Sequence, residues 1–275
     1  MATKAQDVHE SGMFGTQRPD KWWVPPLIIA IGFSIFVVYS MWAGVLGAAH
    51  KEVLPTDPVS SGNHLLSPFF SPCLGEGCAG PFVVPFLEAI PISAAFWILW
   101  APLGFRATCY YYRKAYYRAY FLDPAACAVE EGRQDYKGES AFPFILQNLH
   151  RYFLPFALLL VLFLSYDALL TFKFTDGFGV SIGSLVLTAN VVLLGGYTFG
   201  CHSLRHLIGG KFDCMTCPAG EGDRKERTGY KGWKIVTWFN ERHMLWAWLS
   251  LFWVGFTDLY VRLVSMGIIA DVRLI

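Results

Sequence analysis

Two histidines and two cysteines stand close together in the second half of the chain. His202 and His206 are four residues apart, so on a continuing helix they would share one face. Cys214 and Cys217 follow as a CxxC pair, a spacing that lets two sulfurs reach the same metal ion. The stretch therefore offers two imidazoles and two thiolates as donors for one metal centre.

The chemistry of these four donors leaves several cofactors open. Zinc accepts two Cys and two His in tetrahedral geometry. A Rieske-type [2Fe–2S] centre has the same donor count, with both His on one iron and both Cys on the other. Haem ligation by the histidines and the absence of any metal are the remaining interpretations. His150 and His243, each at the start of an apolar segment, are the alternates if one histidine is misassigned.

The elements that carry these residues are long apolar segments. The chain is 54% hydrophobic and 16% charged, against about 25% charged residues in a soluble domain. Five tracts reach the roughly 20 residues that a membrane crossing needs. They cover 24–49, 82–105, 152–172, 177–204 and 244–269. The sequence predicts an all-α integral membrane bundle of five transmembrane helices in a single domain, 1–275.

The distribution of basic residues indicates the orientation of the bundle. With a cytoplasmic N-terminus, the cytoplasmic segments 1–23, 106–151 and 205–243 hold 18 of the 22 Lys and Arg. Such an excess is the positive-inside signal. We therefore expect the N-terminus, both histidine alternates and the CxxC pair on the cytoplasmic side. The net charge of +1 gives no case for a nucleic-acid partner.

The other cysteines carry weaker signals. Cys73 and Cys78 lie in the first predicted external loop, where they either form a disulfide or remain two separate thiols. Cys201 is interpreted as a small packing residue inside the fourth span. Cys109 and Cys127 have no nearby partner in the sequence and are interpreted as ordinary thiols.

Ionisable residues also occur inside the predicted spans, near their outer ends. Glu88, Asp167 and Asp258 lie on three different spans, and Asp258 is four residues before Arg262. Intramembrane charges are costly and need partners. The Asp258–Arg262 spacing allows a structural ion pair. A proton path through Glu88, Asp167 and Asp258 is the functional alternative.

Five helices, an inward N-terminus and helix-end histidines resemble the single-chain membrane anchor of complex II, the succinate dehydrogenase and fumarate reductase family. The stretch from Ser203 to Leu207, SLRHL, is similar to the Arg-His segment of those anchors. Two features depart from the haem-bearing anchors: Phe199, seven residues before His206, cannot bind iron, and the CxxC pair is foreign to them. The chain is thereby closer to the mycobacterial and actinobacterial anchors, which carry a membrane-embedded Rieske-type [2Fe–2S] cluster.

The resemblance implies a role in respiration at the bacterial inner (plasma) membrane. The chain would bind a flavoprotein subunit and an iron–sulfur subunit and pass electrons from succinate to a quinone, with menaquinone expected. It would be the quinone-reducing subunit of an oxidoreductase and not catalytic alone. Trp23, Trp238 and Arg242 lie at a suitable depth to bind the quinone, although an aromatic belt also explains the tryptophans.

Two rival functions remain at this point. One is a haem-b anchor that uses His150, His206 and His243. The other is a membrane scaffold or transporter with a structural zinc site at the CxxC pair. Optical spectra would reveal haem, and metal analysis would distinguish zinc from iron.

Overall fold

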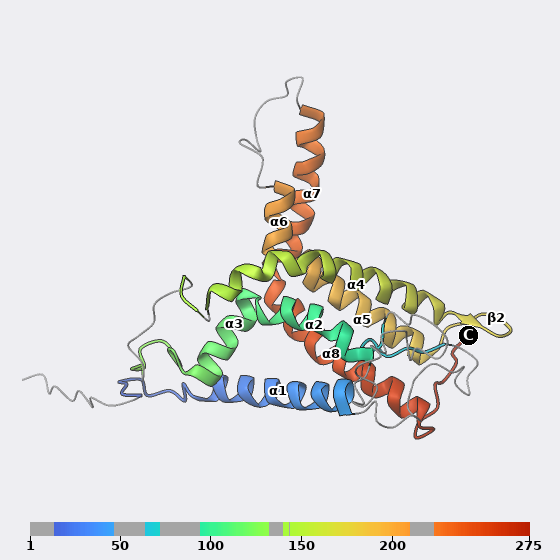
Figure 1. Ribbon diagram of the computed structural model, residues 1–275, viewed down its shortest axis with the longest axis horizontal. Helices are drawn as coiled ribbons and strands as arrows, with labels where there is room; N and C mark the ends of the chain where they lie inside the picture. The colour runs from blue at the N-terminus through green and yellow to red at the C-terminus, as the bar shows by residue number, and fades with distance from the viewer. Residues whose placement is uncertain (1–13, 47–63, 72–93, 132–139, 143, 210–222) are drawn as a thin grey trace, which may run out of the picture.

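A computed structural model describes residues 14–46, 64–71, 94–131, 140–142, 144–209 and 223–275 of the chain. Most of these residues are helical (Figure 1). The main helices are α1 (Val24–Met41), α2 (Ala94–Ala107), α3 (Tyr110–Tyr116), α4 (His150–Leu170), α5 (Ile182–Phe199), α6 (His202–Gly209), α7 (Asp223–Glu241) and α8 (His243–Ser265). Short π-helical turns follow α1 (Trp42–Leu46) and α3 (Tyr117–Phe121), and a 3₁₀ turn, Phe144–Leu149, leads into α4.

Four of the described helical segments are long and apolar enough to cross a membrane: Val24–Gly44, Ile145–Leu170, Ile182–Phe199 and His243–Ser265. They correspond to the first, third, fourth and fifth predicted spans, and they confirm the all-α membrane bundle. Of the second predicted span, 82–105, the described part is α2, which begins at Ala94. The described N-terminal segment and the C-terminus lie at opposite ends of the long axis (Figure 1).

Large apolar side chains cover the outside of this bundle. On α1, for example, Ile28, Ile35 and Val38 are each more than 60% exposed. In water such a surface would be an aggregation hazard, whereas lipid solvates it. In the interior, α8 packs against α5 and α1, and α4 packs against α2 and α5.

Polar groups fix the end of the bundle that is remote from the predicted metal ligands. A two-residue antiparallel hairpin, β1 (Lys173–Phe174) with β2 (Gly177–Phe178), joins α4 to α5. Gly177 has φ +131°, a value that side chains disfavour. Ser181 caps α5 by accepting a hydrogen bond from the backbone N–H of Ser184 at 3.1 Å.

The fourth span is shorter than the sequence predicts. The segment 177–204 is not one helix, because α5 ends at Phe199 and α6 begins at His202. Gly200 and Cys201 form the break between the two helices. An alanine Cβ at Gly200 would lie 2.8 Å from Nδ1 of His243, so this close approach requires glycine.

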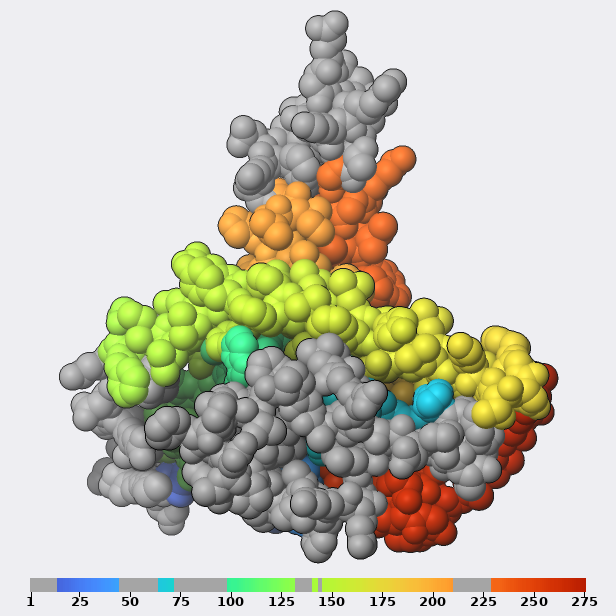
Figure 2. Space-filling view, turned by 45° about the vertical axis from the view of Figure 1, so that its right-hand side comes forward, coloured from blue at the N-terminus to red at the C-terminus, as the bar shows by residue number. Residues whose placement is uncertain are grey.

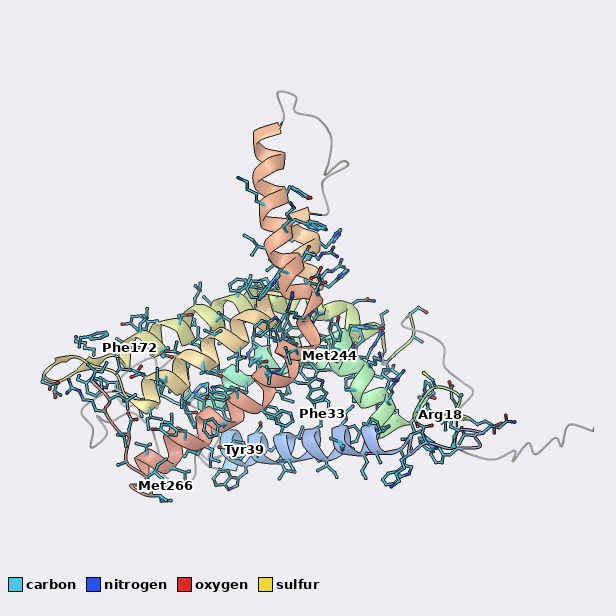
Figure 3. The ribbon with its side chains drawn as sticks, turned by 180° about the vertical axis from the view of Figure 1, so that it is seen from behind. Arg18, Phe33, Tyr39, Phe172, Met244 and Met266 are labelled. Atoms are coloured by element: carbon cyan, nitrogen blue, oxygen red, sulfur yellow. The ribbon has the colours of Figure 1, made fainter. Side chains whose placement is uncertain are left out.

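Helices α6 and α7 form an antiparallel pair that stands out from the body of the molecule (Figures 1 and 2). Arg205 holds the pair together: its guanidinium lies 4.8 Å from the centre of the Trp233 ring and donates to the Thr237 hydroxyl at 3.0 Å. Figure 3 shows Met244, the second residue of α8, where the projecting pair joins the bundle.

Candidate metal centre

Two cysteines and two histidines meet where four helices begin or end. Cys109 precedes α3 just after α2 ends, and His150 is the first residue of α4. Cys201 lies between α5 and α6, and His243 is the first residue of α8. Because successive spans run in opposite directions, these four helix ends fall at the same level of the bundle.

The side chains form two contacting pairs. The Nε2 of His150 lies 3.2 Å from the Sγ of Cys201, and the Nε2 of His243 lies 3.7 Å from the Sγ of Cys109. Both cysteines are at most 2% exposed, and His243 is 3% exposed. Each pair therefore brings one thiol and one imidazole together in the interior of the protein.

Aromatic rings hold both imidazoles in place. Phe105 stacks on His150 with ring centres 4.4 Å apart, and Tyr197 stacks on His243 at 4.9 Å. Phe105 and Tyr197 also contact each other edge to face at 5.4 Å. These rings fix the planes of the two imidazoles and keep water away from them.

Thr108 determines which nitrogen of His150 carries the proton. Its hydroxyl donates its one hydrogen to the carbonyl oxygen of Gly104 at 2.7 Å. It must therefore accept from Nδ1–H of His150, which lies 3.0 Å away. The lone pair of Nε2 then faces Cys201. Metal-binding histidines use this arrangement, with the second ring nitrogen fixed by a hydrogen bond.

The donor set is incomplete without a further group. Two buried polar atoms beside it, Nδ1 of His243 and the hydroxyl of Tyr197, have no hydrogen-bond partner in the described part of the chain. Buried polar atoms without partners are rare and call for an explanation. Burial also raises the pKa of the Cys109 thiol. The thiolate would therefore need a nearby cation for stability, as a metal provides.

The four residues form two Cys–His pairs and not a single-ion site. Among the described residues, no three His, Cys, Asp or Glu side chains gather around a point that could hold a single ion. A Rieske-type centre requires only two protein donors at each of two irons. The four residues are the donor types that such a centre uses.

The structure describes two of the four predicted ligands. His202 and His206 are exposed on α6, and Cys214 and Cys217 lie outside the described residues. That ligand set stays a prediction. The two alternates, His150 and His243, are in contact with cysteines that the sequence led us to interpret as an ordinary thiol and a packing residue. Cys109 and Cys201 lie near the ends of predicted apolar segments, as His150 and His243 do. This shared position was the signal in the sequence that could have identified the two cysteines.

Of the three residues predicted to bind quinone, Trp238 and Arg242 are in contact. The guanidinium of Arg242 lies 4.5 Å from the centre of the Trp238 ring and donates to the Trp238 carbonyl at 3.0 Å. Trp23 precedes α1, and in the described part of the chain no ring contact or hydrogen bond connects it with the other two. Quinone binding at these residues stays a prediction.

The acidic residues of the membrane interior separate into two sites. The ion pair of Asp258 with Arg262 is present, with Nε and Oδ2 2.7 Å apart. Asp258 also accepts hydrogen bonds from the hydroxyls of Tyr39, at 2.5 Å, and Ser67. Asp167 instead accepts from Ser71. Glu88, Cys73 and Cys78 lie outside the described residues, so the predicted proton path and disulfide stay predictions.

Comparison with known proteins identifies the family of the chain. Residues 24–267 match the family described as actinobacterial succinate dehydrogenase subunit SdhC. The chain belongs to this family. No curated protein matches it.

A solved structure supports the assignment. The chain is similar to a chain of the Mycobacterium smegmatis Sdh1 complex in the apo form, with 40% sequence identity, a TM-score of 0.76 and 94% of each chain covered. The protein is therefore the membrane anchor of an actinobacterial succinate dehydrogenase, a multi-pass protein of the bacterial inner membrane and part of an oxidoreductase.

Proposed function

We propose that the chain transfers electrons from the iron–sulfur subunit of succinate dehydrogenase to membrane quinone through a Rieske-type [2Fe–2S] cluster. The ligands in this proposal are Cys109, His150, Cys201 and His243. The carrying observation is the contact of two buried thiols with the buried imidazole of His243 and the partly buried imidazole of His150, at 3.7 and 3.2 Å, at four helix ends. The family membership supplies the electron donor, because it makes the chain part of a succinate dehydrogenase.

The residues of the chain have distinct tasks in this proposal. The bound cluster would supply one-electron transfer. Thr108 orients His150, and Phe105 and Tyr197 fix the two imidazole planes. Buried apolar side chains around the site, including Leu154 and Leu251, exclude water. The flavoprotein and iron–sulfur subunits would bind on the side of the membrane where these helix ends lie, and this side is cytoplasmic in the predicted orientation.

The quinone, expected to be menaquinone, would bind within electron-transfer distance of the same helix ends. Trp238 and Arg242 are positioned directly before His243 at the start of α8. Their exposed ring and guanidinium offer an apolar surface and a hydrogen-bond donor, which are the features a quinone headgroup needs.

Low-temperature EPR of the reduced, purified complex tests the ligand assignment. We expect a [2Fe–2S] signal with the low average g value of histidine ligation, and its loss together with two irons per complex in Cys109→Ala and Cys201→Ala. Cys127→Ala is the matched control, because Cys127 is an exposed cysteine away from the site.

The same experiment separates the rival ligand sets. The double variant His202→Ala/His206→Ala and the variant Cys214→Ala should keep the signal. If the signal were lost in these variants and kept in Cys109→Ala, the cluster ligands would be assigned to the CxxC region instead. Haem bands in a reduced-minus-oxidised optical spectrum, without the EPR signal, would refute the cluster.

A further inference from the structure

Arg106, at the inner end of α2, is an unusual residue for its position. Its side chain is buried, with the residue 9% exposed, and the preceding residue, Phe105, belongs to the same core cluster as Cys109 and Cys201. Its guanidinium donates to the hydroxyls of Tyr112 and Ser250 and, at 3.4 Å, to the carbonyl oxygen of Ala247. All of these partners are neutral.

No carboxylate in the described part of the chain forms an ion pair with Arg106. Buried charges in membrane proteins are costly and are normally paired with an opposite charge. Arg262, at the other end of the bundle, follows that rule by pairing with Asp258 at 2.7 Å. Arg106 therefore carries a positive charge that the described residues do not neutralise.

The charge is directed toward the candidate metal centre. The guanidinium carbon lies 4.8 Å from the centre of the Tyr197 ring, and the same ring stacks on His243 with ring centres 4.9 Å apart. Tyr197 thus contacts both Arg106 and an imidazole of the site. Phe105, the preceding residue, stacks on the second imidazole, His150. Two consecutive residues of α2 are thus connected with both histidines, Phe105 directly and Arg106 through Tyr197.

We propose that Arg106 is a redox-tuning residue, whose buried positive charge raises the reduction potential of the cluster held by Cys109, His150, Cys201 and His243. This inference rests on the proposed function. One electron from the iron–sulfur subunit adds one negative charge to the site. A fixed cation that is one contact away from the site, in a water-poor interior, stabilises the added negative charge. We expect this to raise the equilibrium constant for reduction of the cluster by about tenfold or more. Net charge and burial are known determinants of the potentials of such clusters.

The first test is an EPR-monitored redox titration of the intact complex. Arg106→Gln keeps hydrogen-bond donors but removes the charge. We expect it to lower the equilibrium constant for reduction about tenfold, which lowers the reduction potential by about 59 mV for one electron. Arg106→Lys keeps the charge and should stay within about threefold of the natural protein. An unchanged potential in Arg106→Gln, with the EPR line shape intact, would overturn the proposal.

A matched control separates buried charge from total charge. Arg151→Gln removes a cation directly beside His150, but Arg151 is exposed and screened by solvent. We expect its effect on the potential to be several-fold smaller than that of Arg106→Gln. Equal effects of the two variants would mean that the burial of Arg106 has no special role, which would contradict the proposal.

A second pair of variants leaves Arg106 in place, in case its removal prevents assembly. The Ser250 hydroxyl accepts from Arg106 at 3.0 Å. Ser250→Asp would place a carboxylate on the guanidinium, and Ser250→Asn would place an uncharged group of the same size there. We expect a lower potential for the Asp variant than for the Asn variant by about tenfold. Equal potentials would overturn the inference, whereas the absence of any cluster signal in the unsubstituted complex would refute the proposed function itself.

Discussion

The two ends of the bundle handle buried polar groups in opposite ways. Around Asp258, each charged group has a partner: Arg262 pairs with the carboxylate and also donates to the Ala43 carbonyl at 2.9 Å, and two hydroxyls complete the network. Around Cys109, the described residues give the Arg106 cation only neutral partners, and they give two buried polar atoms no hydrogen-bond partner.

The difference distinguishes a structural network from a binding site. A network that satisfies itself contributes to the fold and needs nothing further. A buried group of side chains with unmet hydrogen bonds and an unmet charge is stable only if something else completes it. Substitutions at the Asp258 end should therefore change stability alone, and substitutions at the Cys109 end should change cofactor binding.

The largest expected effect is a loss of stability at the Asp258 end of the bundle. Asp258→Ala leaves the Arg262 cation buried at 2% exposure without its carboxylate. We expect a loss of stability of about 3–5 kcal/mol, measured by thermal unfolding of the detergent-solubilised complex. The EPR potential of the remaining assembled protein should not change.

The double variant Asp258→Leu/Arg262→Met is the control for this effect. It removes both charges, so it should be clearly more stable than Asp258→Ala. A single variant as stable as the natural protein would show that the ion pair does not maintain this end of the bundle.

Thr108 tests the orientation of the His150 ring. Thr108→Val removes the hydroxyl that fixes Nδ1–H of His150 at 3.0 Å and keeps the shape of the side chain. Losses of such second-layer hydrogen bonds typically lower metal affinity about 10–100-fold. Iron and sulfide content after purification should fall accordingly, whereas Thr108→Ser should keep it. Full iron content in Thr108→Val would argue against His150 as a ligand.

Gly200 tests the space beside His243. In Gly200→Ala the new Cβ would approach Nδ1 of His243 at 2.8 Å. Overpacking of this kind costs about 1–3 kcal/mol, so we expect a displaced ring and a lower cluster content by EPR spin quantification.

Gly255→Ala is the matched control for that substitution. Gly255 lies in the interior of α8, and its new Cβ would make only ordinary contacts, the nearest at 3.7 Å to Phe36. Cluster content should not change there. Equal losses in both variants would point to general helix packing and not to the site.

The smallest expected effect concerns Asp167, a member of the predicted proton path. Asp167 accepts a hydrogen bond from Ser71, and within the described part of the chain no hydrogen bond joins it to the Asp258 network. If the path is absent, Asp167→Asn will leave both turnover and proton stoichiometry unchanged, measured with succinate and a quinone analogue in proteoliposomes. A changed proton stoichiometry would support the path and would give this end of the bundle a functional role.

The bundle itself was predictable because membrane crossing imposes a length and a composition that hydropathy reveals directly. The predicted starts of the first, third and fifth spans lie within two residues of Val24, His150 and His243. The break at Gly200 was not predictable from hydropathy, because the segment is uncharged throughout and the close approach of His243 to Gly200 joins residues far apart in the sequence.

The candidate site illustrates the same limit. The sequence favoured donors that are neighbours along the chain, such as Cys214 and Cys217, because spacing is visible only locally. The contacts of Cys109 with His243 and of Cys201 with His150 depend on how separate helices pack. His150 and His243 were reachable as alternates because the predicted topology places both at the same membrane level.

The position of the four donor residues at four separate helix ends has a consequence for biogenesis. The partners of the two contacting pairs are 51 and 134 residues apart in the sequence, so neither pair is a local feature of the growing chain. The spans must first insert and dock, and only then do Cys109, His150, Cys201 and His243 become neighbours. If these four residues hold the proposed cluster, its loading would report on completed insertion of the chain.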